Sequence, residues 1–171
     1  MYGKTSETCT SNKRPEITLT IDNNNMEMYS NVLNRKISNV TLLLNYVDPI
    51  ELPFNGEFEN VRIKITGTPS ECALKGREVK VVGTLNISGA DNICANINVE
   101  DDAKFITTGN VKGNIDLGKH ASLGVKGNVF GYLKTKTNSE TIIKGILKYK
   151  DSANTSLDTE SIYFGCGSKA K

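Results

Sequence analysis

Large aromatic side chains and histidine are scarce in this chain. Among its 171 residues there is no Trp, aromatic residues make up 6%, and there is one His. The core must therefore be built from Val, Ile and Leu. A zinc site needs several His or Cys ligands at short spacing and is not expected. No apolar run approaches the roughly 18 residues that span a bilayer as a helix.

Cysteine is present, but not at the short spacing of metal or redox sites. The N-terminal residues are polar and lack the apolar stretch of a secretory signal, so we expect the protein to be cytoplasmic. Thiols stay free in that reducing compartment, and no His or acidic partner marks one of them as a nucleophile. We therefore predict structural free thiols at all four positions, Cys9, Cys72, Cys94 and Cys166.

The charge is small in total but unevenly distributed. The net charge is +2, whereas residues 104–150 contain nine Lys and two acidic residues, a local net of +7. A basic region of this kind attracts nucleic acid or an anionic membrane surface. Alternatively, Lys solvates the outer faces of strands and blocks edge pairing, which we favour because no interleaved aromatic residues mark a base-stacking surface. The candidate residues for an anionic partner are Lys112, Lys119, Lys126, Lys134, Lys136 and Lys144.

The first half of the chain is typical of strands with irregular connections. Polar residues predict a tail over 1–15, and we expect 16–80 to be a strand-rich N-terminal cap or the first coils of a larger structure. The spacing of Met26, Tyr29 and Leu33 predicts one short helix. Alternation with period two predicts strands over 16–22, 40–47, 58–66 and 79–88.

From Val81 onward an apolar residue recurs at every sixth position. Nine consecutive positions are apolar, which at an apolar fraction of 37% has a probability on the order of 10⁻⁴ for one phase. Helices are excluded over 81–134, because six residues is not a multiple of 3.6. The series is Val81, Ile87, Ile93, Val99, Phe105, Val111, Leu117, Leu123 and Val129.

This period predicts a β-solenoid over 81–165, followed by a tail over 166–171. The residue before most apolar positions is Asn, Asp or Ser, which tolerate left-handed backbone and favour turns. A short strand and a corner every six residues predict a roughly triangular parallel β-helix with 18 residues per coil. The phase is predicted to slip through 135–140. It then resumes with Ile142, Ile146 and Tyr149. Stacking predicts three inward ladders, Val81–Val99–Leu117, Ile87–Phe105–Leu123 and Ile93–Val111–Val129.

Two repeats in this region carry a resemblance to a known family. Val111-Lys112-Gly113-Asn114-Ile115 and Val125-Lys126-Gly127-Asn128-Val129 resemble the repeats of bactofilins, bacterial cytoskeletal proteins built as a short β-helix. The resemblance covers roughly residues 79–164. It implies polymerisation without nucleotide, by end-to-end stacking of coils, often at the inner membrane surface.

A weaker resemblance is to hexapeptide-repeat acyltransferases, which wind a left-handed β-helix. Leu117-Gly118-Lys119-His120-Ala121-Ser122 and Leu123-Gly124-Val125-Lys126-Gly127-Asn128 fit that template. Such enzymes use a His as general base with an acyl-CoA donor, so the resemblance assigns this role to His120. The alternative is a solvent-facing His without a catalytic role.

Other chemistry-bearing motifs are absent, and we expect no catalytic, cofactor-binding or metal-binding residues. The sequence contains no phosphate-binding loop and no H-E-x-x-H. Glu100, Asp101 and Asp102 suit either a cation or a solvated corner. We favour the solvated corner, because adjacent strand residues point to opposite sides.

The function expected is that of a non-enzymatic structural or scaffolding β-solenoid, acting by self-association or protein binding. One alternative is a small phage- or virus-encoded protein that inhibits a host enzyme or nucleoprotein complex; another is a hexapeptide-repeat acyltransferase. Because the N-terminal half would cap the first coil, we expect a dimer through the C-terminal coil rather than a filament. The residues predicted to make that contact are Ile162, Tyr163 and Phe164.

Overall fold

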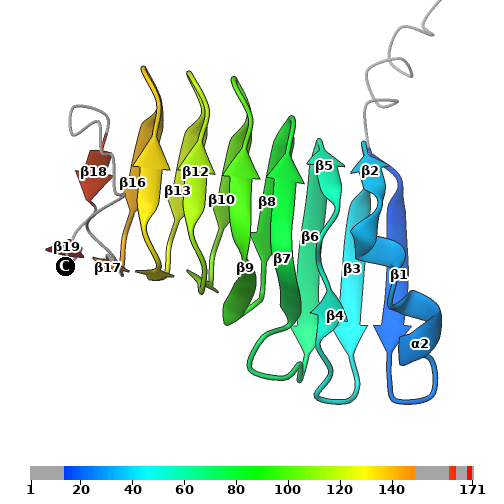
Figure 1. Cartoon of the computed structure of the whole chain (residues 1–171). Coiled ribbons are helices and arrows are strands. Elements are labelled where there is room, and N and C mark those ends of the chain that lie inside the picture. The colour runs from blue at the N-terminus through cyan, green and yellow to red at the C-terminus, as the bar shows by residue number, and fades with distance from the viewer. Residues whose placement is uncertain (1–13, 149–161, 165–168, 171) are drawn as a thin grey trace, which may run out of the picture.

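Parallel strands of successive coils lie side by side and form two sheets that run along the molecule (Figure 1). The computed structural model describes residues 14–148, together with the backbone of 162–164 and 169–170. The first sheet, called sheet A below, comprises β1 (Glu16–Ile21), β3 (Thr41–Tyr46), β6 (Val61–Gly67), β8 (Thr84–Ser88), β10 (Lys104–Thr107), β13 (Ser122–Val125), β16 (Glu140–Ile143) and β18 (Ile162–Phe164).

The second sheet, sheet B, forms the other sides of the solenoid. Its path comprises β2 (Lys36–Ser38), β5 (Glu57–Glu59), β7 (Leu74–Val81), β9 (Asn92–Val99), β11 (Asn110–Val111), β14 (Val129–Phe130), β17 (Ile146–Lys148) and β19 (Lys169–Ala170). Off this path, β4 (Leu52–Pro53) pairs with β7, and β12 (Ile115–Leu117) lies between β9 and β15 (Leu133–Thr135).

The cross-section is three-sided in the coils that follow β9. The first part of β9 pairs with β11 and its second part pairs with β12, so one long strand is succeeded by two short ones. Together with β10, these give three short strands in one coil. The predicted all-β fold, a parallel β-solenoid, is therefore confirmed, with about six turns.

Most of the predicted stacking register is also confirmed. Side chains one coil apart pair directly, and the inward positions are buried. The confirmed pairs are Val81–Val99, Val99–Leu117, Ile93–Val111, Val111–Val129 and Phe105–Leu123.

One predicted pair is wrong. Ile87 pairs with Thr107 and not with Phe105. The turn of residues 100–103 is longer than the turn of 82–83 that precedes it by one coil, so β10 is displaced by two residues relative to β8. The next corner is shorter by the same amount, which restores the register. A count in sixes cannot detect two length changes that cancel.

The predicted slip of phase after Lys134 is also wrong. The inward series continues through Thr135 and Thr141, each paired with a Leu one coil earlier. Consequently Ile142 faces outward and is 50% exposed, Ile146 is half-buried, and Tyr149 lies outside the described residues. Thr has the branched shape of Val and fits the ladder. Because its side chain carries a hydroxyl, Thr is not counted as apolar, and a search for apolar periodicity misses these two positions.

The residues with left-handed backbone lie at a different corner from the one predicted. Predicted corner residues such as Asn86, Asn98 and Asp116 lie inside strands. The corners that precede β3, β6, β10, β13 and β16 on sheet A carry the positive φ angles instead. The non-glycine residues concerned are Asn39, Asn60, Asp102, His120 and Asn138.

Asparagine side chains form a hydrogen-bonded ladder along a second corner. Asn110 Nδ2 donates to Asn92 Oδ1 at 3.0 Å, and Asn128 Nδ2 donates to Asn110 Oδ1 at 3.1 Å. Asn110 Oδ1 also accepts the backbone N–H of Asn128 at 2.8 Å, and Asn128 Oδ1 accepts that of Ile146 at 2.7 Å. The ladder satisfies corner amides that no strand pairs.

The N-terminal half continues the same sheets, with wider coils. Side chains one coil apart are separated by 21 residues at Asn34–Asn55 and Asn39–Asn60 but by 18 at Asn92–Asn110. The expected short helix is found as α2 (Met26–Tyr29) and the 3-10 turn η1 (Val32–Asn34), which lie beside β1 and β2 at the N-terminal end (Figure 1).

The core changes character along the axis. The wide coils bury Tyr46, Phe54 and Phe58, whose rings fill the larger cross-section. The Tyr46 hydroxyl donates to the Ala73 carbonyl at 2.7 Å, and burial raises the Tyr46 pKa far above its ordinary value. The tighter coils bury mainly aliphatic side chains, including Ala121, together with the ring of Phe105.

Candidate functional surfaces

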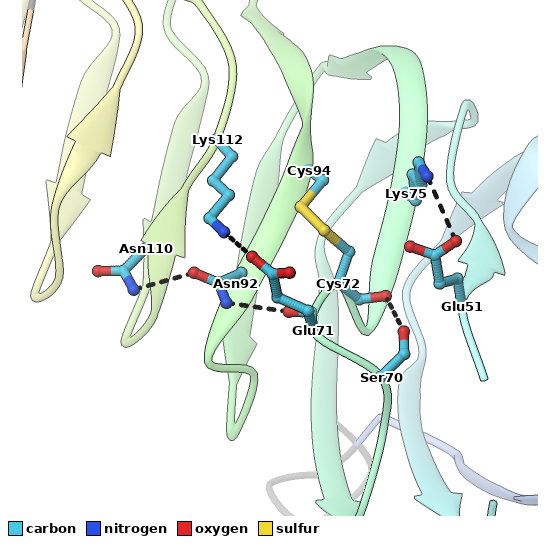
Figure 2. The surroundings of a disulfide bond; sticks show 9 residues. All are labelled: Glu51, Ser70, Glu71, Cys72, Lys75, Asn92, Cys94, Asn110 and Lys112. Carbon is cyan, nitrogen blue, oxygen red and sulfur yellow. Dashed lines mark hydrogen bonds and ion pairs between the residues drawn. A yellow bond between two sulfur atoms is a disulfide. The ribbon is translucent and has the colours of Figure 1, made fainter. Parts of the chain in front are cut away.

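A disulfide joins two neighbouring coils where the connection between β6 and β7 protrudes (Figure 2). Cys72 and Cys94 are 22 residues apart, with their Cα atoms separated by 5.7 Å. The prediction of free thiols is therefore wrong for these two, while Cys9 and Cys166 lie outside the described residues. The spacing of 22 residues is close to the length of one wide coil. In a solenoid, two side chains spaced by one coil length lie on adjacent coils, so this spacing was the sequence signal for the disulfide.

Polar contacts surround this disulfide and involve one of the candidate lysines. Lys112 Nζ forms an ion pair with a Glu71 carboxylate oxygen, and the hydrogen bond and charge of Lys112 lower the Glu71 pKa. Asn92 Nδ2 donates to the Glu71 carbonyl at 2.9 Å (Figure 2). Lys112 is therefore engaged within the chain, although an exposed pair of this kind contributes little to stability.

The six lysines proposed for an anionic partner do not lie in one patch. Lys112 follows β11, beside the disulfide. Lys134 and Lys136 belong to the side formed by β12 and β15, and Lys119 lies in the turn between β12 and β13. The remaining two, Lys126 and Lys144, follow β13 and β16 on sheet A.

The side of Lys134 and Lys136 also carries acidic groups. A hollow of about 270 Å³ on this side is lined by both lysines and by Glu100, Asp101 and Asp116. Asp116 lies directly opposite Lys134 in the β12–β15 ladder. Opposite charges in register offset one another, so this side offers no uniform attraction for an anion.

The acidic turn and His120 occupy a single corner, but the carboxylates do not converge. Asp101 Oδ1 accepts the backbone N–H of Lys119 at 2.7 Å, whereas Asp102 Oδ1 lies 3.5 Å from His120 Nδ1. His120 Nε2 lies 3.3 Å from Asn138 Nδ2, and its side chain is 57% exposed. No group of His, Cys, Asp and Glu able to hold a metal ion occurs within the described ranges.

An apolar strip lies on the outer face of sheet A, across β10, β13 and β16. Ile106, Gly124 and Ile142 are in register along it and border a groove of about 290 Å³. The sides of the groove carry charged residues, Lys104, Lys126, Glu140 and Lys144. The sequence pattern did not indicate the strip, because the predicted slip turned Ile142 inward.

From residue 14 onward, the described chain covers the N-terminal end of the solenoid only in part. Leu33 of η1 is buried, whereas Ile17 and Met28 are 47% and 73% exposed. The neighbour of Ile17 in β3, Leu42, is buried. A hollow of about 600 Å³ lies at this end, and Ile17, Met28, Val32 and Leu42 are among the residues that line it.

At the opposite end, β18 continues sheet A beyond β16. The backbone of Ile162, Tyr163 and Phe164 pairs in parallel with Thr141, Ile142 and Ile143. The side chains of these three predicted contact residues lie outside the described part of the structure.

Nothing in the described part of the chain forms a helix that is long and apolar enough to cross a membrane. Comparisons with models of protein families, with curated proteins and with solved structures find no match.

Proposed function

We propose that this protein is a non-enzymatic structural module that associates with other copies of itself through the ends of the solenoid. The observation that carries the proposal is the N-terminal end, where β1 is the edge strand of sheet A among the described strands and lies beside exposed apolar side chains. Parallel edge strands offer unpaired N–H and C=O groups to another chain. End-to-end stacking of this kind is what the bactofilin resemblance implies.

The second copy is the favoured occupant because the end repeats the internal pattern of the molecule. Ile17 pairs with Leu42, and Leu42 pairs with Ile63, so each coil presents an aliphatic side chain at this inward position. Another coil placed on β1 would cover Ile17 in the way that β3 covers its other side. The C-terminal coil, with Ile162, Tyr163 and Phe164, is the proposed contact at the opposite end.

Sizing by light scattering, together with electron microscopy of the purified protein, tests the proposal. Ile17→Arg and Phe164→Arg each place a charge at one end, and Thr18→Arg, at an exposed outward position next to Ile17, is the matched control. Loss of assembly with either end variant indicates head-to-tail stacking. Loss with Phe164→Arg alone indicates the two-fold C-terminal dimer expected from the sequence. A monomeric parent protein, or assembly unchanged in both variants, overturns the proposal.

A cytoplasmic location stays a prediction, but one consequence expected from it is not met. Cys72 and Cys94, expected to be free thiols in a reducing compartment, are bonded in the structure. Disulfides persist mainly in oxidising compartments. Alkylation of the protein with and without reductant, followed by mass spectrometry, measures whether the pair is oxidised where the protein resides.

A further inference from the structure

We infer that the outer face of sheet A across β10, β13 and β16 binds an extended segment of a partner protein with an apolar residue and a carboxylate two positions apart. This inference is independent of whether the ends of the solenoid associate. It rests on three properties of the groove, which are its apolar floor, its charge and its spacing.

The floor of the groove is an apolar strip with a notch at its centre. Gly124 lies in register between Ile106 and Ile142. A Cβ atom added to Gly124 would meet only the Ile106 side chain, at 3.8 Å, so the space above this glycine is open. Ile142 is 50% exposed, so its side chain adds apolar surface to the strip. One apolar side chain of a ligand would cover both isoleucines.

The charge of one flank is uniformly positive. Lys126 and Lys144 follow β13 and β16 and lie one coil apart, so both face the space beside the strip. The opposite flank is mixed, because Lys104, Ser122 and Glu140 are in register there. Within the described ranges none of these three lysines forms an ion pair. A ligand carboxylate is therefore attracted to the Lys126 flank, while the other flank accommodates neutral polar groups.

The spacing selects an extended polypeptide. Side chains on one face of a strand recur every second residue, about 7 Å apart. Ile142 and Lys144 follow this spacing, as do Gly124 and Lys126. A partner segment lying along the strand direction has the same period. It places an apolar side chain over Gly124 and, two residues away, a carboxylate between Lys126 and Lys144. A partner that binds only through scattered charge has no reason to require this period.

Two synthetic peptides with the same amino-acid composition test whether binding depends on the spacing between the apolar residue and the carboxylate. The matching probe is Gly-Thr-Val-Thr-Glu-Thr-Gly, and the control is Gly-Thr-Thr-Val-Glu-Thr-Gly, in which Val and Glu are adjacent and point to opposite faces. Each is titrated into the isotope-labelled, oxidised full chain at low ionic strength, and backbone amide shifts are followed by NMR. We expect the shifts to concentrate in β10, β13 and β16. The matching probe should bind at least about threefold more tightly than the control.

Three variants place the binding on this face. Lys126→Glu with Lys144→Glu should weaken the matching probe by ~10-fold, since two attractions become repulsions. Gly124→Val should weaken it by ~3-fold by filling the notch without loss of fold. The matched control, Lys134→Glu with Lys136→Glu, makes the same charge change on another side of the solenoid and should leave the affinity unchanged.

Other results overturn the inference. Equal affinity for the two probes, or equal loss in both charge-reversal variants, indicates non-specific attraction. Binding of phosphatidylglycerol vesicles or of oligo-dT through Lys126 and Lys144, without binding of the matching probe, indicates a membrane or nucleic acid. An affinity that rises when Asp158 and Glu160 are replaced by Ser indicates that residues 149–161 of this chain occupy the groove.

Discussion

Both halves of the solenoid stack successive coils in register, but their coils differ in the number of residues. In the N-terminal half, neighbouring coils are offset by 21 residues at Asn34–Asn55, while at Asn110–Asn128 the offset is 18. The wide coils have room for rings, and they bury Phe54 and Phe58 with centroids 5.1 Å apart. The tight coils bury mainly aliphatic side chains and Thr, together with the single ring of Phe105 in β10.

This difference shows what sets the sequence pattern in each half. A tight coil has corners of only two to four residues, so the inward positions must recur at near-constant spacing, and the hexads follow. A wide coil places its extra residues in protruding connections such as residues 68–73, which the Cys72–Cys94 disulfide attaches to β9. A constant spacing of inward-facing residues and a disulfide between coils are therefore two alternative ways to hold successive coils in register.

The largest expected effect comes from a charge placed in the tight core. Val111 is fully buried in the ladder between Ile93 and Val129. Val111→Asp buries an unpaired carboxylate and should cost several kcal/mol of unfolding free energy. Lys112→Ser, next to it on the outside, loses only an exposed ion pair and should cost less than about 1 kcal/mol. Urea denaturation compares the two; equal losses would contradict the assigned register.

The next largest effect is expected in the wide coils, on removal of the disulfide. Cys72→Ser with Cys94→Ser opens a loop of 22 residues and should lower the unfolding free energy by about 3 kcal/mol, mainly through the entropy of the unfolded chain. Hydrogen exchange should accelerate in β7 and β9 and stay unchanged in β13 and β16. Uniform acceleration would show that the two halves unfold as one unit. The reduced parent protein is the control.

Two glycines of the tight coils differ in the space available for a Cβ atom, and replacing each by Ala tests how closely successive coils approach. A Cβ on Gly113 would lie 2.1 Å from the Ala95 carbonyl oxygen, so Gly113→Ala should destabilise the protein by about 2 kcal/mol. Gly124→Ala meets only ordinary contacts and should be neutral. Thermal melts measure both, and a neutral Gly113→Ala would mean that corner spacing is looser than the structure indicates.

The smallest effect is expected from the asparagine ladder. Asn110→Ala removes an acceptor from the backbone N–H of Asn128 and should cost about 1 kcal/mol, because that amide is partly accessible to water. Asn86→Ala, inside β8 and without a hydrogen bond of this kind within the described region, should change stability by less than about 0.5 kcal/mol. Denaturation midpoints of the two variants give the contribution of the ladder directly.

Much of the fold follows from local sequence periodicity. Whether Val81, Val99 or Leu117 faces the core depends on alternation along a strand, which is a property of neighbouring residues. The hexad period then implies stacked three-sided coils. The short helix near Met26 is also local in origin. These features could be predicted because no distant residue decides them.

The pairing between coils and the outer surfaces depended on tertiary structure. Whether Ile87 meets Phe105 or Thr107 depends on the lengths of two corners, and each corner is held by backbone hydrogen bonds to the next coil. The same holds for the disulfide, and for the groove at Gly124, whose three strands are far apart in the sequence. The sequence by itself determined which side chains face inward, since that needs only a period. Only the stacked structure decided which of them meet, because stacking distance and register are set jointly by every corner in between.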